Sequence, residues 1–301
     1  MDSPHGAAVK AEDFGLKGPR GWVFRNIAID AAPGSITAVE GPSGSGRTCL
    51  LLALTGRMKP TEGHAEVGGH RLPKKMAAVR RIAALGPVSG VNDLDQALTV
   101  AEQLREGALL QRRYEGPIRA LFRPRGERRA SAAARIEEAL AVAGLDLATL
   151  PKGPRTSVRD LERLESVRLS VAIALLGEPR LLALDDLDLK LSDAERAEAW
   201  SLLRAIAARG TTVFAVCSEA PQDIPVVRTG TPDAKPATTP ETSTKPDVAS
   251  DAKPDSEPDA KPDTKPETAQ DTDTAPDTET NTNTKPNTKG TDDALAEARR
   301  A

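Results

Sequence analysis

The residues best suited to chemistry lie in one glycine-rich stretch, Gly41–Thr48, with the sequence GPSGSGRT. Its spacing fits the phosphate-binding pattern G-x-x-x-x-G-[K]-[ST], except that Arg47 stands where lysine is usual. Glycines let backbone N–H groups turn toward phosphate oxygens, and the hydroxyl of Thr48 is a suitable oxygen ligand for Mg²⁺. The pattern therefore predicts a nucleotide site formed by Gly41, Pro42, Ser43, Gly44, Ser45, Gly46, Arg47, Thr48 and Cys49.

A glycine-rich loop can also be only a flexible turn. A short β-branched run before it, residues 35–40, and an apolar, helix-like run after it, residues 49–54, favour the phosphate site. Arg47 keeps the positive charge but replaces a compact ammonium with a larger planar fork. We expect phosphate binding to tolerate this change better than catalysis does.

A second chemical feature is the apolar run 180–184, which ends in two carboxylates, Asp185 and Asp186. In nucleotide hydrolases the first such carboxylate holds magnesium and the second can orient the attacking water. We therefore expect Thr48 and Asp185 to hold Mg²⁺, and Asp186 to be the water-orienting catalytic residue. Its side chain is one methylene shorter than a glutamate, and acids that merely cap a surface strand remain the alternative.

The elements that must position these residues alternate between strands and helices. The pattern predicts strands at 22–30, 35–40, about 65–67, 180–186 and 211–217, and helices at 47–56, 164–176 and 194–208, with more helix between about 98 and 165. This order predicts an α/β fold with a mostly parallel sheet of the P-loop NTPase type and a helical subdomain inserted at about 98–165.

Composition divides the 301 residues into two unlike parts. Residues 231–290 hold 10 of the 24 prolines and a net charge of −6, with one valine and no aromatic residue. The sequence thus predicts a nucleotide-binding domain over 1–228, whose folded part ends near Ala220 and is followed by a short connector. It also predicts a disordered Thr/Pro/Asp/Lys-rich tail over 229–290 and a possible short helix at 291–301. The net charge of −3 for the whole chain excludes a strongly basic nucleic-acid binder.

Several features favour a cytoplasmic protein. No apolar run approaches the roughly 20 residues of a membrane-spanning helix, and the first residues do not form a signal-peptide pattern. Cys49 and Cys217 lie far apart and are typical of small core residues, while the three histidines and two cysteines have no metal-binding spacing.

Between residues 14 and 219 the chain resembles the ATP-binding domain of ABC transporters. The resemblance rests on the phosphate loop, on Leu98–Leu104 (LTVAEQL), on 139–145, and on 175–186. It implies ATP and Mg²⁺ as cofactors, an N-terminal antiparallel β region, a membrane permease as partner, and a homo- or heterodimer of nucleotide-binding domains. It also implies a position at the inner face of the cell membrane through the permease, and no nucleic-acid partner.

Several family motifs are degenerate in this sequence. The signature LSGGQ aligns with residues 161–165, LERLE, whose two glutamates would repel a phosphate. The loop expected to carry a glutamine, Ile82–Asp95, contains none, and the switch histidine aligns with Ser218. Residues 191–193 (LSD) stand where Leu-Asp is usual. Trp22 is the aromatic residue near enough to stack on adenine.

These observations leave two main hypotheses. The first is an ATP-binding subunit of an ABC transport system, coupled to a permease, with weak or partner-dependent hydrolysis and an intact partner domain favoured. The alternative is a nucleotide-responsive regulatory module, a pseudo-ATPase without steady turnover. A non-transport ATPase acting on DNA or ribosomes is disfavoured, since tandem domains and long coiled-coil inserts are absent from the sequence. The arginine-rich stretch 111–129 is read as a solvated loop, with contact to acidic lipids or a permease as the alternative.

Overall fold

The computed structural model describes residues 5–112 and 125–230, without the side chains of residues 111–112 and 125–131. Its central sheet consists of five short, mostly aliphatic strands: β3 (Ile36–Glu40), β6 (Ala83–Leu85), β7 (Leu181–Leu184), β8 (Thr212–Val216) and β9 (Val226–Arg228). They lie in the order β6-β7-β8-β3-β9, and every neighbouring pair is parallel. The carboxyl ends of these strands therefore meet at one edge, which is where parallel α/β sheets bind ligands.

A second, antiparallel sheet covers part of this one. Its strands are β1 (Val9–Gly18), β2 (Gly21–Ala31), β4 (Glu62–Val67) and β5 (His70–Leu72), in the order β2-β1-β4-β5. On β2, Phe24, Ile27 and Ile29 are buried among exposed neighbours, as expected of a strand with one face toward a core. The antiparallel region near the N-terminus is thus confirmed.

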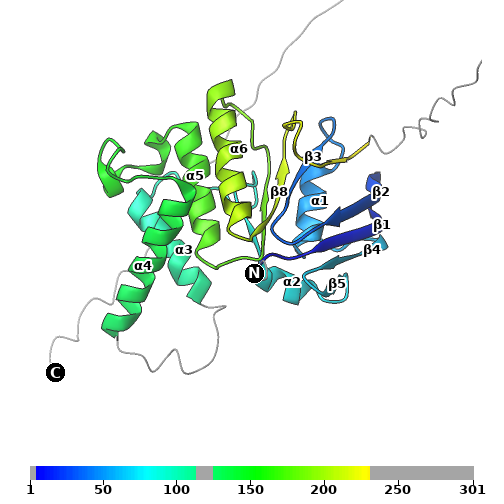
Figure 1. Ribbon diagram of the computed structural model, residues 1–301, viewed down its shortest axis with the longest axis horizontal. Coiled ribbons are helices and arrows are strands. Elements are labelled where there is room, and N and C mark those ends of the chain that lie inside the picture. The colour runs from blue at the N-terminus through cyan, green and yellow to red at the C-terminus, as the bar shows by residue number, and fades with distance from the viewer. Residues whose placement is uncertain (1–4, 113–124, 231–301) are drawn as a thin grey trace, which may run out of the picture. The chain divides into compact units, whose positions relative to one another are not determined.

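Six helices occupy the described residues (Figure 1): α1 (Arg47–Leu54), α2 (Met76–Ile82), α3 (Val100–Arg112), α4 (Arg125–Ala143), α5 (Arg163–Leu175) and α6 (Asp193–Ala208). Two short 3-10 turns, Gly153–Arg155 and Val158–Asp160, lead from α4 toward α5. In Figure 1, α5 and α6 lie on one side of the parallel sheet, and α1 lies on the other side with the antiparallel strands. The predicted α/β fold with inserted helices is confirmed.

The burial of β7 explains how the sheet separates two hydrophobic cores. Successive side chains of a strand point to opposite faces. Leu181 and Ala183 accordingly pack with α1 and the antiparallel sheet, whereas Leu182 and Leu184 pack with α5 and α6. All four residues are buried completely. β7 is therefore fixed from both faces, and Asp185 directly follows it.

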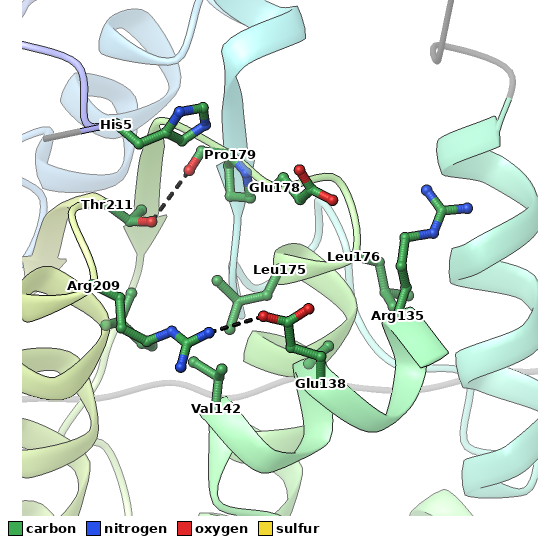
Figure 2. A pocket seen from close by; sticks show the side chains of 12 residues that line it. His5, Arg135, Glu138, Val142, Leu175, Leu176, Glu178, Pro179, Arg209 and Thr211 are labelled. Atoms are coloured by element: carbon green, nitrogen blue, oxygen red, sulfur yellow. Dashed lines mark hydrogen bonds and ion pairs between the residues drawn. The ribbon is translucent and has the colours of Figure 1, made fainter. Parts of the chain in front are cut away.

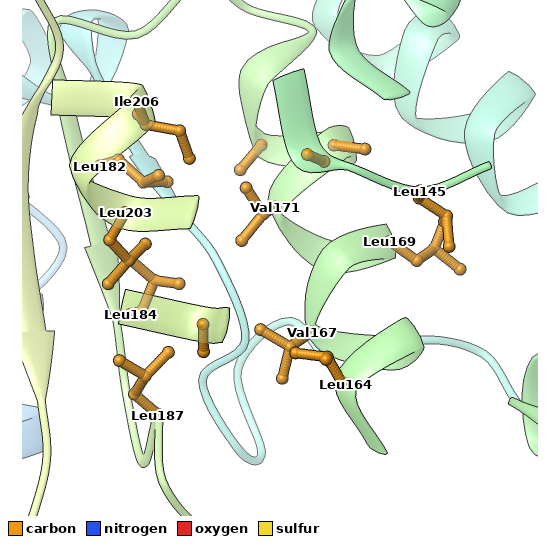
Figure 3. Close-up of a cluster of buried hydrophobic side chains, with 14 of the residues drawn as sticks. Leu145, Leu164, Val167, Leu169, Val171, Leu182, Leu184, Leu187, Leu203 and Ile206 are labelled. Atoms are coloured by element: carbon orange, nitrogen blue, oxygen red, sulfur yellow. The ribbon is translucent and has the colours of Figure 1, made fainter. Parts of the chain in front are cut away.

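Helix α5 packs against two different neighbours. Figure 3 shows Val167 and Val171 directed toward Leu184 and Leu203, while Leu169 points toward Leu145 on the other side. Val167, Leu169 and Val171 are each at most 1 % exposed. α5 is buried on more than one face because it packs both on the parallel sheet and on the helical subdomain.

The prediction that the domain ends near Ala220 was wrong. β9 follows this point and pairs with β3, with Ala38 opposite Val226 and Glu40 opposite Arg228. β9 has only three residues, with a single pair of apolar side chains, and this pattern is too short to be identified as a strand from the sequence. The tail was predicted to begin at residue 229, but Thr229 is buried and its N–H donates to the backbone oxygen of Glu40, so this residue belongs to the folded domain. The tail beyond residue 230, the helix predicted at 291–301 and most of the arginine-rich stretch 111–129 lie outside the described residues.

Candidate functional site

The glycine-rich loop joins the end of β3 to the start of α1. Gly44 and Gly46 have φ angles of 80° and 83°, in the left-handed region that favours glycine. At Gly46, an added Cβ would lie only 2.4 Å from the backbone oxygen of Val23 on β2. α1 begins directly after this glycine, so its N-terminal N–H groups face the loop, an arrangement suited to an anion.

Thr48 and Asp185 meet at this edge of the sheet. The hydroxyl of Thr48 donates a hydrogen bond of 2.5 Å to Oδ2 of Asp185. One residue comes from the first turn of α1 and the other from the end of β7. The structure thus brings together the two oxygen donors predicted to hold magnesium, and a hydroxyl with a carboxylate is a ligand set that fits this hard cation.

Asp185 is only 5 % exposed. Burial raises the pKa of its carboxyl above the ordinary 3.8, and the neighbouring charge of Asp186 acts in the same direction. The hydrogen bond from Thr48 and the positive charge of Arg47 oppose this rise. The site therefore concentrates negative charge in a partly desolvated position, where a cation would be stabilised.

Asp186 adopts a left-handed backbone with φ of 44°, and its N–H donates to Oδ1 of Asp185 at 3.1 Å. A non-glycine residue in this region usually marks a turn or a constrained site. Its carboxylate lies near that of Asp185 and, among the described residues, accepts no hydrogen bond that would fix it. The geometry leaves it available to a water molecule.

Arg47 does not extend into open loop space. Its Nη1 donates to the backbone oxygen of Cys217, at 3.3 Å, just beyond the end of β8. The guanidinium thereby connects the loop to the strand end that leads to Ser218. Ser218 itself donates its N–H to the carboxylate of Asp188.

The segment aligned with the family signature begins α5. The carboxylate of Glu165 accepts the N–H of Glu162, 2.9 Å away, in a capping-box arrangement. Leu164, where the family has a glycine, is 7 % exposed and belongs to the core. This helix N-terminus is thus satisfied by its own acidic side chain, and the bulky Leu164 is required for packing.

Ser192 is likewise used for helix capping. Its hydroxyl accepts the N–H of Glu195 and donates to that residue's carboxylate at 2.6 Å, at the start of α6.

Trp22 lies beside Val23, the residue that contacts Gly46. The ammonium of Lys17 lies 5.5 Å from the ring centre of Trp22. One face of the indole is therefore covered by a cation.

The loop that should carry a glutamine is closed by Asn92. The amide of Asn92 donates to the backbone oxygens of Leu85 and Gly86. Beyond this loop, a pocket of about 340 Å³ is lined by Asp185 together with Gln96, Arg163 and Ser170. Gln96 lies one residue outside the expected loop, so reasoning from the motif missed it; its amide type was the available signal.

Another pocket, of about 390 Å³, lies away from the glycine-rich loop and is shown in Figure 2. It is lined by Pro179 and Thr211, which precede β7 and β8, so it lies at the opposite end of these strands from the loop. Arg209, which directly follows α6, and Glu138 of α4 form an ion pair of 2.9 Å across it. None of the predicted site residues lines this pocket.

Within the described residues, no helix is both long and apolar enough to cross a membrane. The same part of the chain contains no cluster of three or more His, Cys, Asp or Glu residues placed to hold a metal.

Known proteins resemble this chain over the same elements. The family model described as ABC transporter matches residues 24–187. The chain is 30 % identical over 218 residues to Nod factor export ATP-binding protein I from Rhizobium johnstonii, covering 71 % of this chain and 63 % of that protein. It is 28 % identical over 193 residues to cholesterol transporter ABCA5 from Mus musculus, covering 64 % of this chain and 10 % of that much longer protein. The chain thus spans less than two thirds of either relative.

Solved structures agree on the fold. A dimeric bacterial ABC transporter cassette, MJ0796, superposes with a TM-score of 0.58 at 20 % identity, covering 74 % of this chain and 95 % of that one. An ATP-bound bacterial Atm1-family ABC exporter gives a TM-score of 0.55 at 21 % identity, over 76 % of this chain and 38 % of the exporter. With the family match over more than half of its length, the chain belongs to the ABC transporter family as an ATP-binding, P-loop NTPase domain.

Proposed function

We propose that this chain is the ATP-binding subunit of an ABC-type transport system, which binds Mg-ATP and couples it to a membrane permease. The observation that carries the proposal is the contact between Thr48 and Asp185 beside the open glycine-rich loop. In this proposal residues 41–49 hold the phosphates, Thr48 and Asp185 hold magnesium, and Trp22 lies beside the adenine.

The partner of the proposed dimer is a second nucleotide-binding subunit with an intact signature. In such dimers each phosphate lies between the loop of one subunit and a helix N-terminus of the other. Here the N-terminus of α5 carries Glu162 and Glu165, and the carboxylate of Glu165 accepts the N–H of Glu162. A homodimer would therefore place carboxylates against both phosphates, whereas an intact partner would leave the loop of this chain with one favourable composite site.

Intrinsic hydrolysis is proposed to be weak or to depend on that partner. Asp186 would orient water with a shorter side chain than glutamate, and Ser218 has no imidazole to assist it. Positioning errors of about 1 Å are enough to reduce rates by about a hundredfold. The magnesium ion would neutralise phosphate charge, while Arg47 and the loop N–H groups would orient the phosphates.

The alternative function is a regulatory module that binds ATP without steady turnover. The capping of the α5 N-terminus by Glu165 favours the regulatory function. A subunit that does not complete a phosphate site on a partner does not need a free helix N-terminus there. Relatives named for Nod factor export and for daunorubicin resistance, the latter 33 % identical over 189 residues in Streptomyces coeruleorubidus, favour the transport function.

The test is equilibrium binding of Mg-ATP to the full chain, followed by ATP turnover with and without a candidate partner subunit and permease. The proposal expects magnesium-dependent binding, and turnover that rises with the partner and is abolished by Asp185→Asn. Absence of ATP binding by the folded wild-type chain would refute both functions. Binding without turnover in the assembled permease complex would leave only the regulatory module.

A further inference from the structure

The phosphate loop has a buried contact with the last strand of the sheet. The hydroxyls of Ser45 and Thr229 lie 2.6 Å apart, although the residues are 184 positions apart in sequence. Ser45 is 1 % exposed and Thr229 is 2 % exposed. Thr229 directly follows β9, so this contact joins the loop to the strand that the sequence pattern did not identify.

This pair of hydroxyls is tied to the end of β3. Either hydroxyl can donate within the pair. The hydroxyl of Thr229 also lies 3.2 Å from the backbone oxygen of Glu40, and it donates to that oxygen when Ser45 supplies the proton between the two hydroxyls. The N–H of Thr229 also donates to this oxygen, at 2.8 Å.

The hydrogen bonds among Ser45, Thr229 and Glu40 hold the middle of the glycine-rich loop. Ser45 lies between Gly44 and Gly46, both of which have the left-handed backbone that turns the loop. At Gly41, an added Cβ would lie 2.2 Å from Oγ1 of Thr229 and 2.6 Å from Oγ of Ser45. The two hydroxyls therefore pack directly beneath the start of the loop, and only glycine leaves room for them.

We propose that Thr229 is a positioning residue for phosphate binding: its hydroxyl holds Ser45 and, through it, the loop in the conformation that receives the phosphates. The inference rests on the proposed function and adds a residue outside the motif to that site. Removing the hydroxyl leaves the buried hydroxyl of Ser45 without its partner, so the loop must move to regain one. β9 thereby contributes to the nucleotide site through one side chain.

The experiment compares full-length Thr229→Val, which keeps the shape and loses the hydroxyl, with Thr229→Ser, which keeps the hydroxyl. We expect the Kd for Mg-ATP to rise about tenfold in the valine variant, equivalent to about 1.4 kcal/mol, and to stay within about twofold of wild type in the serine variant.

Thr156→Val is the matched control. Thr156 is also fully buried and its hydroxyl accepts a hydrogen bond, from the N–H of Lys152, but it lies in the helical subdomain. Thr156→Val should lower the urea concentration at the midpoint of unfolding without changing the Kd for Mg-ATP.

Ser45→Ala tests the same bond if the valine variant does not fold, because it removes the other hydroxyl of the pair and leaves Thr229 able to donate to Glu40. It should also weaken Mg-ATP binding, and the double variant should bind no more than about twofold more weakly than Thr229→Val alone. If the fold-changes in Kd of the two single variants instead multiply in the double variant, the two hydroxyls act independently and the coupling between Ser45 and Thr229 is contradicted. If wild type binds Mg-ATP and Thr229→Val binds equally well, this inference fails while the proposed function stands. A wild-type chain without ATP binding refutes both.

Discussion

The hydroxyl of Thr48 and the carboxylate of Asp185 form a hydrogen bond of 2.5 Å although 137 positions separate the residues in sequence. The bond exists because β3 and β7 end at the same edge of the parallel sheet, with β8 between them. α1 then carries Thr48 back over this edge. The contact places a neutral oxygen donor and a buried carboxylate at the mouth of the glycine-rich loop.

Thr48→Ala should abolish the magnesium dependence of ATP binding, because it removes one of the two proposed oxygen ligands. Thr48→Ser keeps the hydroxyl and should bind within a few-fold of wild type. Titration of the full chain with ATP, with Mg²⁺ and with EDTA, measures both. Thr149→Ala is a suitable control, since the hydroxyl of Thr149 is exposed and bonds only to the backbone of Asp146. Equal magnesium dependence in wild type and Thr48→Ala would contradict the assignment.

Gly46→Ala should cost more stability than Gly44→Ala. Both positions have left-handed backbones, a cost of about 1–2 kcal/mol for an L-residue. The new Cβ at Gly46 would also meet the Val23 oxygen at 2.4 Å, whereas at Gly44 nothing lies within 4 Å. Such a clash adds about 1–3 kcal/mol. Urea unfolding of the two variants gives the comparison, and equal losses would show that β2 does not constrain the loop.

Glu165→Ala should destabilise the fold by about 1 kcal/mol, the usual value of a lost helix cap. Glu165→Gln should be nearly neutral, because the amide oxygen can still accept the N–H of Glu162. The free energy of unfolding from urea titration separates the two. If the alanine variant is as stable as wild type, the N-terminus of α5 does not depend on its own side chain.

Cys217 should resist alkylation in the folded protein. Burial, followed by the negative charges of Asp188 and Glu40, raises the pKa of its thiol from the ordinary 9.0 to about 12. At pH 8 the thiolate fraction is then about one in ten thousand, and the thiolate is the reactive form. Iodoacetamide labelling read by mass spectrometry should modify Cys217 only after denaturation. Because the folded pKa is raised, the thiol's contribution to stability is complete below pH 9 and is lost as pH rises toward 12.

The local part of the site could be predicted from the sequence because its signals are local. Glycine spacing indicates a loop that surrounds an anion, and an apolar run ending in acids indicates a strand edge. Ser45 was accordingly assigned to the phosphate loop from the motif. Its bonding partner Thr229 was not found, since nothing in a three-residue strand or a single threonine indicates a contact with residue 45.

By itself the sequence determined the fold class, the extent of the loop and the loss of the family's signature, glutamine and histidine motifs. These depend on residue type and spacing along the chain. The tertiary structure alone decided which side chains meet: Thr48 with Asp185, Ser45 with Thr229, and Arg47 with the backbone of Cys217. It also decided that Glu165 caps α5 and that Gln96 lies in a pocket with Asp185. Such pairings depend on strand order and helix packing, which bring distant residues together without leaving a local pattern.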